Sequence, residues 1–357
     1  MFHILIEGGM KRKDSLINKI RWKLLKFSYR FYKLPVFDKK QNVAYVLNVS
    51  NHPNAGDQEI TLAQQKFINR YLPDHVYVEI EKEKTQYIID GLLKKLKKDD
   101  FVFIQGGGTV SDLYPEHEYP RRLLLNKLSN TPCKIIQFPI STHFLDNEEF
   151  KETVRVFNNN KNLVVFARES KTYNLLHNSL SIPCYHIPDI VISQDTSKHM
   201  SRGNDIIIMF RSDKECLLPQ NIAKGVVEHY SNNGDLVLTD NYVENYIPTT
   251  LKNREGLLDK KFNEFRAAKL VITDRLHGMI FAYITKTPAV VFDNSYGKVS
   301  NSYKDWLSEC PYIKYLDATN ISMNDIIKAA DEAMHANKNF SLDVDEAFKP
   351  LVEILAK

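Results

Sequence analysis

The chain contains 357 residues, of which 43% are hydrophobic and 26% are charged. These values are typical of a folded globular protein, and the length favours two domains over a single core. The formal net charge is +4, and the basic excess is concentrated between Lys11 and Lys33, where nine Lys and Arg residues accompany one acid, Asp14. A basic surface spread over the whole fold, as nucleic-acid binding requires, is therefore excluded.

The four cysteines lie far apart, and the sequence has no C-x-x-C pair and no secretory leader pattern. Both observations favour free thiols in a reducing cytoplasm. The eleven histidines lack the spacing of a zinc site, and no nicotinamide-binding, P-loop or G-x-S-x-G motif occurs. No run approaches the roughly 20 apolar residues of a membrane span. We therefore expect a cytoplasmic protein without a metal ion, a cofactor or a transmembrane helix.

The first predicted element is a helix in "KRKDSLINKIRWKLLKFSYRFYKL", residues 11–34. Apolar residues recur every three or four positions, at Ile17, Ile20, Leu24, Phe27 and Phe31. One interpretation is a basic amphipathic helix that lies in an anionic membrane interface. The other is a terminal helix that packs its apolar stripe on its own domain.

Short β-branched and aromatic runs alternate with helical patterns from residue 42 onward. The runs cover residues 42–50, 101–105, 134–140, 163–167, 205–210, 235–240, 270–274 and 289–293. Because continuous apolar strands alternating with helices are typical of buried parallel sheets, the pattern predicts an α/β fold with two doubly wound, Rossmann-like domains. A polar segment at 194–204 separates them. The predicted parts are the N-terminal helix at 1–38, an N-terminal domain at 39–198 and a C-terminal domain with terminal helices at 199–357.

In open parallel sheets the ligand lies beyond the carboxyl ends of the strands, so the residues that follow each strand are the candidates for chemistry. After the first strand, Gly56 permits a tight turn, and Asp57 can cap a helix that starts near Gln58. Such a turn is either an anion site or an ordinary helix start capped by Asp57. The second predicted strand, at 101–105, is followed by three glycines, Gly106, Gly107 and Gly108, and then by Ser111 and Asp112. Three consecutive glycines indicate the close approach of a ligand or of another backbone.

Polar and cationic residues follow the next strands. Ser141 ends "QFPIS", Arg168 ends "FAR", and Arg211 follows "IIIMF". An arginine at a helix start is opposed by the helix dipole, so these positions are favourable when an anion shares the site. The alternative for Arg168 is a salt bridge to Glu169 or Asp189.

The most informative stretch is "TDRLHG", which follows the strand at 270–274. Arg275 offers a planar fork suited to carboxylate or phosphate. His277, with an ordinary pKa of about 6.5, can exchange a proton near neutrality. Separated by one residue at a strand-to-helix turn, the two side chains can hold an anion and move a proton beside it.

The succession "NAGD", "FIQGGGTVSDLY", "QFPIST", "ARES", "IPDIVI" and "TDRLHGMIFAYITKTPAVVFDNSYGKVSNSYKDW" resembles the polysaccharide pyruvyl transferase family over roughly residues 42–310. The resemblance implies two Rossmann-like domains facing each other across a cleft, as in GT-B glycosyltransferases. It also implies transfer of the enolpyruvyl group of phosphoenolpyruvate onto a sugar of a surface polysaccharide, with a pyruvate ketal as product. Many relatives read G-G-G-N-x-G-D, whereas this chain has Thr109 and Ser111 and keeps Asp112.

The resemblance implies that Arg275 and His277 serve the phosphoenolpyruvate site and its acid/base work, with Arg168 as a second anion ligand. As a mechanism we expect His277 to be the general acid and Asp112 or Asp57 the base. The expected substrate-binding residues are Arg275, Leu276, Gly278, Arg168, Arg211, Gly107, Gly108 and Ser141. Phosphoenolpyruvate would be the co-substrate and a lipid-linked repeat unit the acceptor, which would give the N-terminal helix a reason to bind the cytoplasmic face of the membrane. A nucleotide-sugar glycosyltransferase and a non-catalytic membrane-associated scaffold remain the alternatives.

Overall fold

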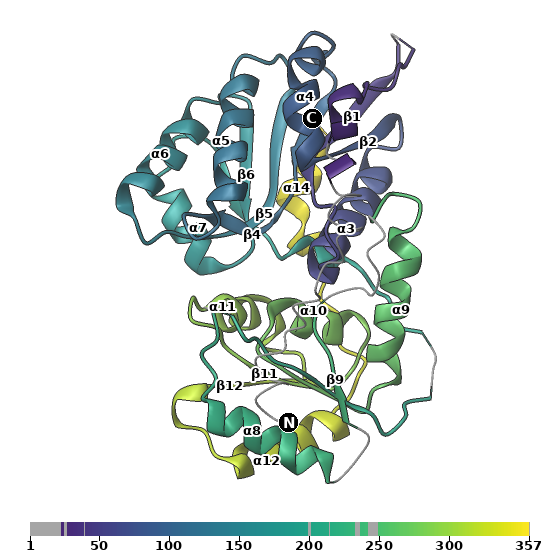
Figure 1. Ribbon diagram of the computed structural model, residues 1–357, viewed down its shortest axis with the longest axis vertical. Coiled ribbons are helices and arrows are strands. Elements are labelled where there is room, and N and C mark those ends of the chain that lie inside the picture. The colour runs from purple at the N-terminus through teal and green to yellow at the C-terminus, as the bar shows by residue number, and fades with distance from the viewer. Residues whose placement is uncertain are drawn as a thin grey trace. The chain divides into compact units, whose positions relative to one another are not determined.

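A computed structural model describes residues 23–24, 27–38, 40–198, 201–213, 215–232, 236–241 and 249–356. Two parallel sheets, each accompanied by helices, confirm the predicted α/β fold class (Figure 1). The described residues divide into two compact units. The N-terminal unit contains residues up to 52, 60–190 and 349–356, and the C-terminal unit contains 53–59 and 191–348.

The sheet of the N-terminal unit has the strand order β2-β1-β3-β5-β6-β7, with β4 beside β5, and every pairing is parallel. The strands are β1 (Asn42–Val49), β2 (His75–Glu81), β3 (Phe101–Ile104), β4 (Gly107–Ser111), β5 (Lys134–His143), β6 (Leu163–Ala167) and β7 (Cys184–His186). Strands β2 and β3 pair with opposite edges of β1. The strand order therefore reverses beside β1, and this reversal is where a doubly wound sheet offers room for a ligand.

The helical segments of this unit are η1 (Tyr29–Phe31), most of α3 (Ala55–Tyr71), α4 (Lys82–Leu93), α5 (Pro115–Leu128), α6 (Asn147–Asn158), α7 (Ser170–His177) and α14 (Lys349–Leu355). Helix α6 illustrates why they form. The Asp146 carboxylate accepts the N–H groups of Glu148 and Glu149, which caps the first turn. Val156 and Phe157 on its inner face are fully buried, so capping and burial together define the helix.

The sheet of the C-terminal unit has the order β12-β11-β10-β8-β9, again with parallel pairings only. Its strands are β8 (Ile206–Met209), β9 (Leu236–Leu238), β10 (Leu270–Thr273), β11 (Ala289–Phe292) and β12 (Ile313–Leu316). Every residue of β8, β10 and β11 is buried, which explains their unbroken apolar sequences. The order reverses between β8 and β10, so the residues after Met209 and Thr273 lie at the switch point of this sheet.

The helical segments of this unit are η2 (Ile190–Ser193), α8 (Gln220–Ser231), α9 (Arg254–Ala267), α10 (Leu276–Ile284), α11 (Lys298–Ser302), the π-helix η3 (Tyr303–Leu307), η4 (Ala318–Asn320), α12 (Met323–His335) and α13 (Val344–Ala347). None of the helices in the described ranges combines the length and hydropathy needed to cross a membrane. The predicted helix at 11–34 falls mostly outside the described residues, which include only 23–24 and 27–34 of it.

The observed units divide the chain differently from the predicted domains at 39–198 and 199–357. The first border lies after Ile190, and segment 53–59 belongs to the C-terminal unit. That segment is held there because Ala55 N–H donates to the carbonyl of Asn241 over 2.7 Å. Helix α14 returns to the N-terminal unit, where Leu351 is fully buried and the carbonyl of Ile354 accepts from Lys134 Nζ. Such long-range contacts leave no local trace in sequence periodicity.

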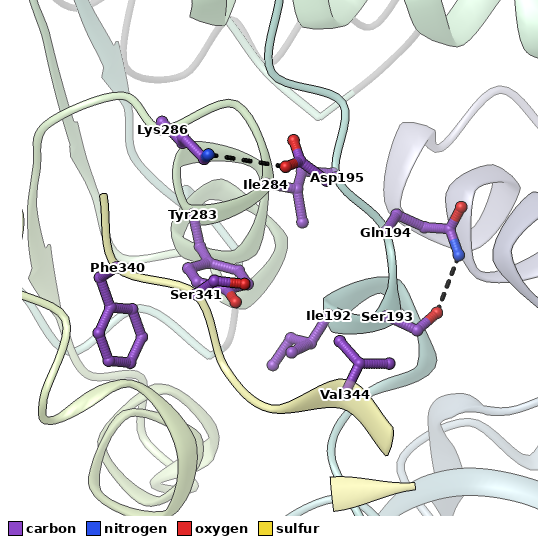
Figure 2. Close-up of a pocket in the computed structure, with 10 residues that line it drawn as sticks. All are labelled: Ile192, Ser193, Gln194, Asp195, Tyr283, Ile284, Lys286, Phe340, Ser341 and Val344. Carbon is purple, nitrogen blue, oxygen red and sulfur yellow. Dashed lines mark hydrogen bonds and ion pairs between the residues drawn. The ribbon is translucent and has the colours of Figure 1, made fainter. Parts of the chain in front are cut away.

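A small cavity of about 50 Å³ lies in the C-terminal unit at the carboxyl end of α10 (Figure 2). Tyr283 and Ile284 of α10 line it, together with residues 192–195, Phe340, Ser341 and Val344. The Lys286 ammonium at its rim lies 3.6 Å from Asp195 Oδ2. Because α10 leads from the carboxyl end of β10 to the amino end of β11, the cavity lies at the sheet edge opposite the switch point. Its volume suits water molecules and no larger ligand.

The first two glycines of the triplet each have a structural cause. A Cβ on Gly106 would lie 2.6 Å from the carbonyl oxygen of Pro139, and Gly107 has a φ of 113°.

We expect Gly106→Ala to lower the free energy of unfolding by about 1–3 kcal/mol, because the backbone carbonyl of Pro139 cannot move aside without distorting its strand. Gly91→Ala in α4 is the control: no atom lies within 4 Å of its Cβ position, and it should stabilise the protein by about 0.5–1 kcal/mol. Urea titration measures both, and equal effects would contradict the steric explanation.

Candidate active site

The side chain of Thr273 organises the switch point of the C-terminal sheet. Its hydroxyl donates to the carbonyl of Met209 over 2.8 Å and accepts the backbone N–H of Arg275 over 3.0 Å. One threonine thus joins the ends of β8 and β10 and sets the turn into α10. Gly278 packs directly on it, since a Cβ there would lie 2.5 Å from Thr273 Oγ1. The glycine of "RLHG" is therefore required by this contact.

Helix α10 begins at Leu276 without a side-chain cap, and Arg275 occupies the N-cap position with extended backbone. The first N–H groups of an α-helix have no partner within the helix, and its dipole makes this end favourable for an anion. Leu276 itself is buried, so its contribution at this position is packing and a backbone N–H. The start of α10 therefore has the chemistry of an anion site.

The Arg275 guanidinium is mostly buried, with 14% of the side chain exposed. One terminal nitrogen lies 2.7 Å from Asp240 Oδ1. Its Nε is buried without a hydrogen-bond partner in the described part of the chain. Arg275 thus has Asp240 as a carboxylate partner and one buried donor left over, for which an additional acceptor would be favourable.

The His277 imidazole lies against the first turn of α3. A Cβ on Gly56 would come within 2.6 Å of the ring carbon Cγ, and closer still to Nδ1. The Phe281 ring, one turn along α10, has its centroid 5.9 Å from that of His277. The structure therefore places the histidine of "TDRLHG" beside the "NAGD" motif, two segments more than 200 residues apart in the sequence.

The predicted cap of α3 by Asp57 is wrong. The helix begins at Ala55, and Asn54 Oδ1 accepts the N–H groups of Gly56 and Asp57 over 2.9 and 3.3 Å. Asp57 lies within the first turn, where its charge complements the helix dipole. Because Asn54 satisfies these donors, this helix start is closed to an anion. Asp57 as a base remains a prediction.

Asp274 is a candidate that the residue patterns did not single out. It is fully buried, and its Oδ1 accepts the backbone N–H of Arg211 over 2.8 Å. Its Oδ2 is buried without a hydrogen-bond partner among the described residues. Burial raises the pKa of this carboxyl to about 6, although Arg275 and Arg211 lower it in part. Its place directly after a buried strand at the switch point was the signal that could have found it.

Arg211 lies at the same edge, but carboxylates surround its guanidinium. Asp213 and Glu215 each lie 2.9 Å from it. Glu215 also accepts from Asn294 and pairs with Lys298. These pairs neutralise Arg211 locally, so Arg275 is the better placed of the two arginines to receive an anion.

In the N-terminal unit, Arg168 forms a salt bridge rather than facing an open site. Its NH1 lies 2.7 Å from Asp189 Oδ2, and its Nε donates to Ser141 Oγ over 2.6 Å. Ser141 in turn donates to Glu169. All four side chains are nearly inaccessible, and breaking such a network would leave a buried charge uncompensated. The salt-bridge alternative for Arg168 is therefore the arrangement that the structure describes.

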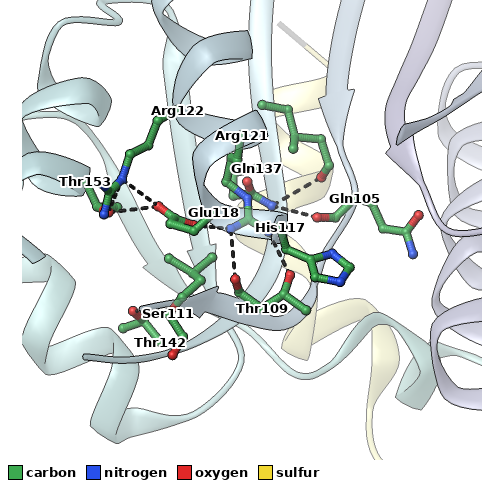
Figure 3. A network of polar contacts seen from close by, with 12 residues as sticks. Gln105, Thr109, Ser111, His117, Glu118, Arg121, Arg122, Gln137, Thr142 and Thr153 are labelled. Atoms are coloured by element: carbon green, nitrogen blue, oxygen red, sulfur yellow. Dashed lines mark hydrogen bonds and ion pairs between the residues drawn. The ribbon is translucent and has the colours of Figure 1, made fainter. Parts of the chain in front are cut away.

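The glycine-rich segment is held by helix α5 (Figure 3). Arg121 donates to the Thr109 hydroxyl over 2.9 Å and to its carbonyl over 3.3 Å. Buried Glu118 forms ion pairs with Arg121 and Arg122. Thr109, where many relatives carry Asn, thus has a fixed structural partner. Charged residues at i, i+3 and i+4 on a buried helix face were the sequence signal for this network.

Asp112 closes the other end of β4. Its Oδ2 accepts the backbone N–H groups of Leu145 and Asp146 over 2.8 and 2.6 Å, while Oδ1 is buried without a hydrogen-bond partner in the described ranges. The carboxylate therefore fixes the turn into α6.

The predicted site residues fall into two groups, one in each unit. Asp57, Arg211, Arg275, Leu276, His277 and Gly278 lie in the C-terminal unit, and Gly107, Gly108, Asp112, Ser141 and Arg168 lie in the N-terminal unit.

The described residues contain no group of three or more His, Cys, Asp or Glu side chains placed to hold a metal ion.

The comparison that decides the family is the match of residues 54–296 to the model of the polysaccharide pyruvyl transferases. The chain belongs to this family. Membership supports a transferase of the pyruvyl transferase type, and the matched range includes both "NAGD" and "TDRLHG".

Similar proteins agree with this assignment. General stress protein 30 of Bacillus subtilis is 30% identical, with 89% of this chain and 92% of that protein covered. Pyruvyl transferase 1 of Schizosaccharomyces pombe is 24% identical, with 82% and 76% covered. The solved UDP-GlcNAc 2-epimerase of Methanocaldococcus jannaschii has a TM-score of 0.50 at 14% identity, with 88% of this chain and 99% of that chain covered. This last likeness concerns the fold alone.

The buried carboxyl of Asp274 generates a pH-dependent prediction. Its pKa is raised from 3.8 to about 6, so its stabilising contribution is present below pH 4 and lost as the pH rises through 6. Asp274→Asn keeps an acceptor for Arg211 N–H and cannot ionise. Its stability relative to wild type should therefore increase between pH 4 and pH 7, by on the order of 3 kcal/mol.

Urea titrations at several pH values measure this difference. Asp213→Asn is the matched control. Partial burial is the largest single influence and raises the pKa of Asp213, but the hydrogen bond and charge of Arg211, the Glu215 N–H and the charge of Arg275 together outweigh it, so the net pKa is lowered. The relative stability of this variant should change with pH in the opposite direction. A difference between Asp274→Asn and wild type that is constant with pH would contradict the prediction.

Proposed function

We propose that the chain transfers the enolpyruvyl group of phosphoenolpyruvate to a sugar of a surface polysaccharide repeat unit, with release of phosphate and formation of a pyruvate ketal. The observation that carries the proposal is the uncapped start of α10 at the switch point, flanked by Arg275 and His277. The family assignment supports the pyruvyl transfer, and the chemistry of these groups supports the donor.

Charge is the first argument for this donor. Phosphoenolpyruvate has a phosphate and a carboxylate separated by a few bonds, so its site needs two positions that attract anions. The first N–H groups of α10 supply one, and the Arg275 fork supplies the other. Asp240 occupies part of that fork. Binding would therefore exchange one carboxylate for another group of the same charge.

Proton transfer is the second argument. His277 would donate a proton to the methylene carbon of phosphoenolpyruvate, and the sugar hydroxyl oxygen would bond to the adjacent carbon as a carboxylate base takes its proton. The carbon–oxygen bond to phosphate then breaks, and a second hydroxyl of the same sugar adds and loses its proton to close the ketal. The base would be Asp57 or Asp112. Asp57 directly follows Gly56, which lies against the His277 imidazole. The reaction needs no redox cofactor, since the enol phosphate supplies the driving force.

Two substitutions separate the proposed roles. His277→Ala should reduce turnover by at least about 100-fold and change phosphoenolpyruvate affinity only a few fold, because a general acid acts mainly in the transition state. Arg275→Ala should weaken phosphoenolpyruvate binding by about tenfold or more, and Arg275→Lys should recover it only partly, since an ammonium lacks the planar fork. Arg155→Ala, on an exposed ion pair of α6, is the control.

Phosphate release in the presence of lipid-linked or simple glycosides measures turnover, and calorimetry measures binding. UDP- and GDP-sugars are the comparison ligands in a thermal-shift assay. Near wild-type turnover of His277→Ala would remove this residue from the mechanism. Stabilisation by a sugar nucleotide without any response to phosphoenolpyruvate would replace the proposal with glycosyl transfer.

We further propose that the N-terminal segment binds an anionic membrane, where a lipid-linked acceptor would be found. Leu24, Phe27 and Phe31 from the predicted apolar stripe are 65%, 56% and 69% exposed, as expected for side chains that enter a lipid interface. Arg30 lies over the Phe27 ring at 5.6 Å, while Tyr29 is buried and anchors the segment. Exposure of these three side chains supports membrane binding over packing on the protein's own domain.

Vesicle co-sedimentation tests this proposal. The full chain should bind phosphatidylserine vesicles and bind neutral phosphatidylcholine vesicles weakly. Replacing Leu24, Phe27 and Phe31 together by Ser keeps every charge and should weaken binding by about tenfold, because the buried apolar area is lost. Deletion of residues 1–35 should abolish it, with turnover on a soluble acceptor preserved. Unchanged binding after deletion would leave the segment a structural role only.

A further inference from the structure

We propose that Gly56 is a positioning residue for His277: the missing side chain at the start of α3 leaves the space that the imidazole occupies. The proposal rests on the proposed function in one respect only, namely that His277 moves the proton. It adds that the "NAGD" segment forms one wall of the donor site, with a steric role.

The steric argument is direct. The Cβ of any larger residue at position 56 would lie 2.6 Å from His277 Cγ and 3.0 Å from Asn241 Nδ2. Real Cβ atoms do not approach a ring carbon this closely, so the imidazole or the helix would have to move. Gly56 has no positive φ, so its backbone suits any residue. The requirement for glycine therefore comes from the nearest side-chain atoms, which belong to the imidazole and Asn241.

The wall against which the imidazole rests is rigidly attached. Ala55 N–H donates to the carbonyl of Asn241 over 2.7 Å. Four residues after Asn54, Gln58 Oε1 accepts from Arg254 Nε over 2.9 Å, and this arginine is only 1% exposed. Asn54 closes the first turn by accepting the N–H groups of Gly56 and Asp57. Because the segment is fixed at both ends, a new methyl group would displace the ring more readily than the helix.

This role differs from those of the other constrained glycines. Gly278 accommodates the Thr273 hydroxyl, and Gly106 accommodates a backbone carbonyl. Of these three glycines, Gly56 is the one that has the proposed proton donor as its neighbour. A displaced imidazole would still be present and able to titrate, but it would have left the position from which we propose that it donates its proton. Misplacement of a catalytic group by about 1 Å can cost on the order of 100-fold in rate.

The experiment compares Gly56→Ala with Gly256→Ala. Gly256 lies in α9 of the same unit, and no atom lies within 4 Å of its Cβ position. We expect Gly56→Ala to reduce turnover by on the order of 100-fold with phosphoenolpyruvate affinity changed less than about threefold. It should also shift the His277 imidazole resonances and their titration midpoint in NMR spectra. Gly256→Ala should change none of these quantities.

A double-mutant cycle gives a readout independent of activity. Gly56→Ala should lower the urea unfolding midpoint in the wild-type background and lower it much less in the His277→Ala background, where the ring is absent. Equal losses in both backgrounds, or unchanged His277 resonances, would overturn the inference even if the enzyme uses phosphoenolpyruvate. Coupling of the two residues without any turnover of phosphoenolpyruvate would uphold the steric inference and overturn the proposed function.

Discussion

The hydroxyl of Thr273 is the contact on which the candidate site depends. It bonds to the carbonyl that ends β8 and to the N–H that precedes α10, so the two strands flanking the switch point end at a common level. The first turn of α10 then follows directly, with Arg275 before it and His277 within it. Gly278 allows this turn to lie directly on Thr273. A small hydroxyl and an absent side chain together place an uncapped helix start where a doubly wound sheet binds its ligand.

Largely buried arginines pair with carboxylates in both units. Arg168, Arg121 and Arg122 pair with carboxylates of their own unit, and Arg275 pairs with Asp240. At the switch point of the C-terminal sheet, two neighbouring residues also keep a buried atom that is unsatisfied within the part of the chain that the structure describes. Arg275 retains a buried Nε without a hydrogen-bond partner in the described ranges, and Asp274 retains a buried oxygen in the same condition. Polar groups left partly unsatisfied in a buried site cost stability, and active sites are where such costs are retained.

The fold could be predicted largely from local patterns, because strands β3, β6, β8, β10 and β11 are buried on both faces. Fully buried strands need continuous apolar runs, and these runs are visible at 205–210, 270–274 and 289–293 without any knowledge of the pairing. The position of "TDRLHG" after such a run also indicated a ligand edge. The boundaries between units were harder to predict, since α14 and segment 53–59 are assigned by contacts with residues distant in the chain.

The sequence by itself determined the class of fold, the family and the strand after which Arg275 and His277 lie, because periodicity and motif spacing are local properties. Only the tertiary structure decided which residues become partners. Arg168 pairs with Asp189, 21 residues away, and Asp274 accepts the backbone N–H of Arg211, 63 residues away. Gly56 lies against the imidazole of His277, more than 200 residues away. Such pairings are set by strand order and by the space left between packed elements, and both arise only when the whole chain has folded.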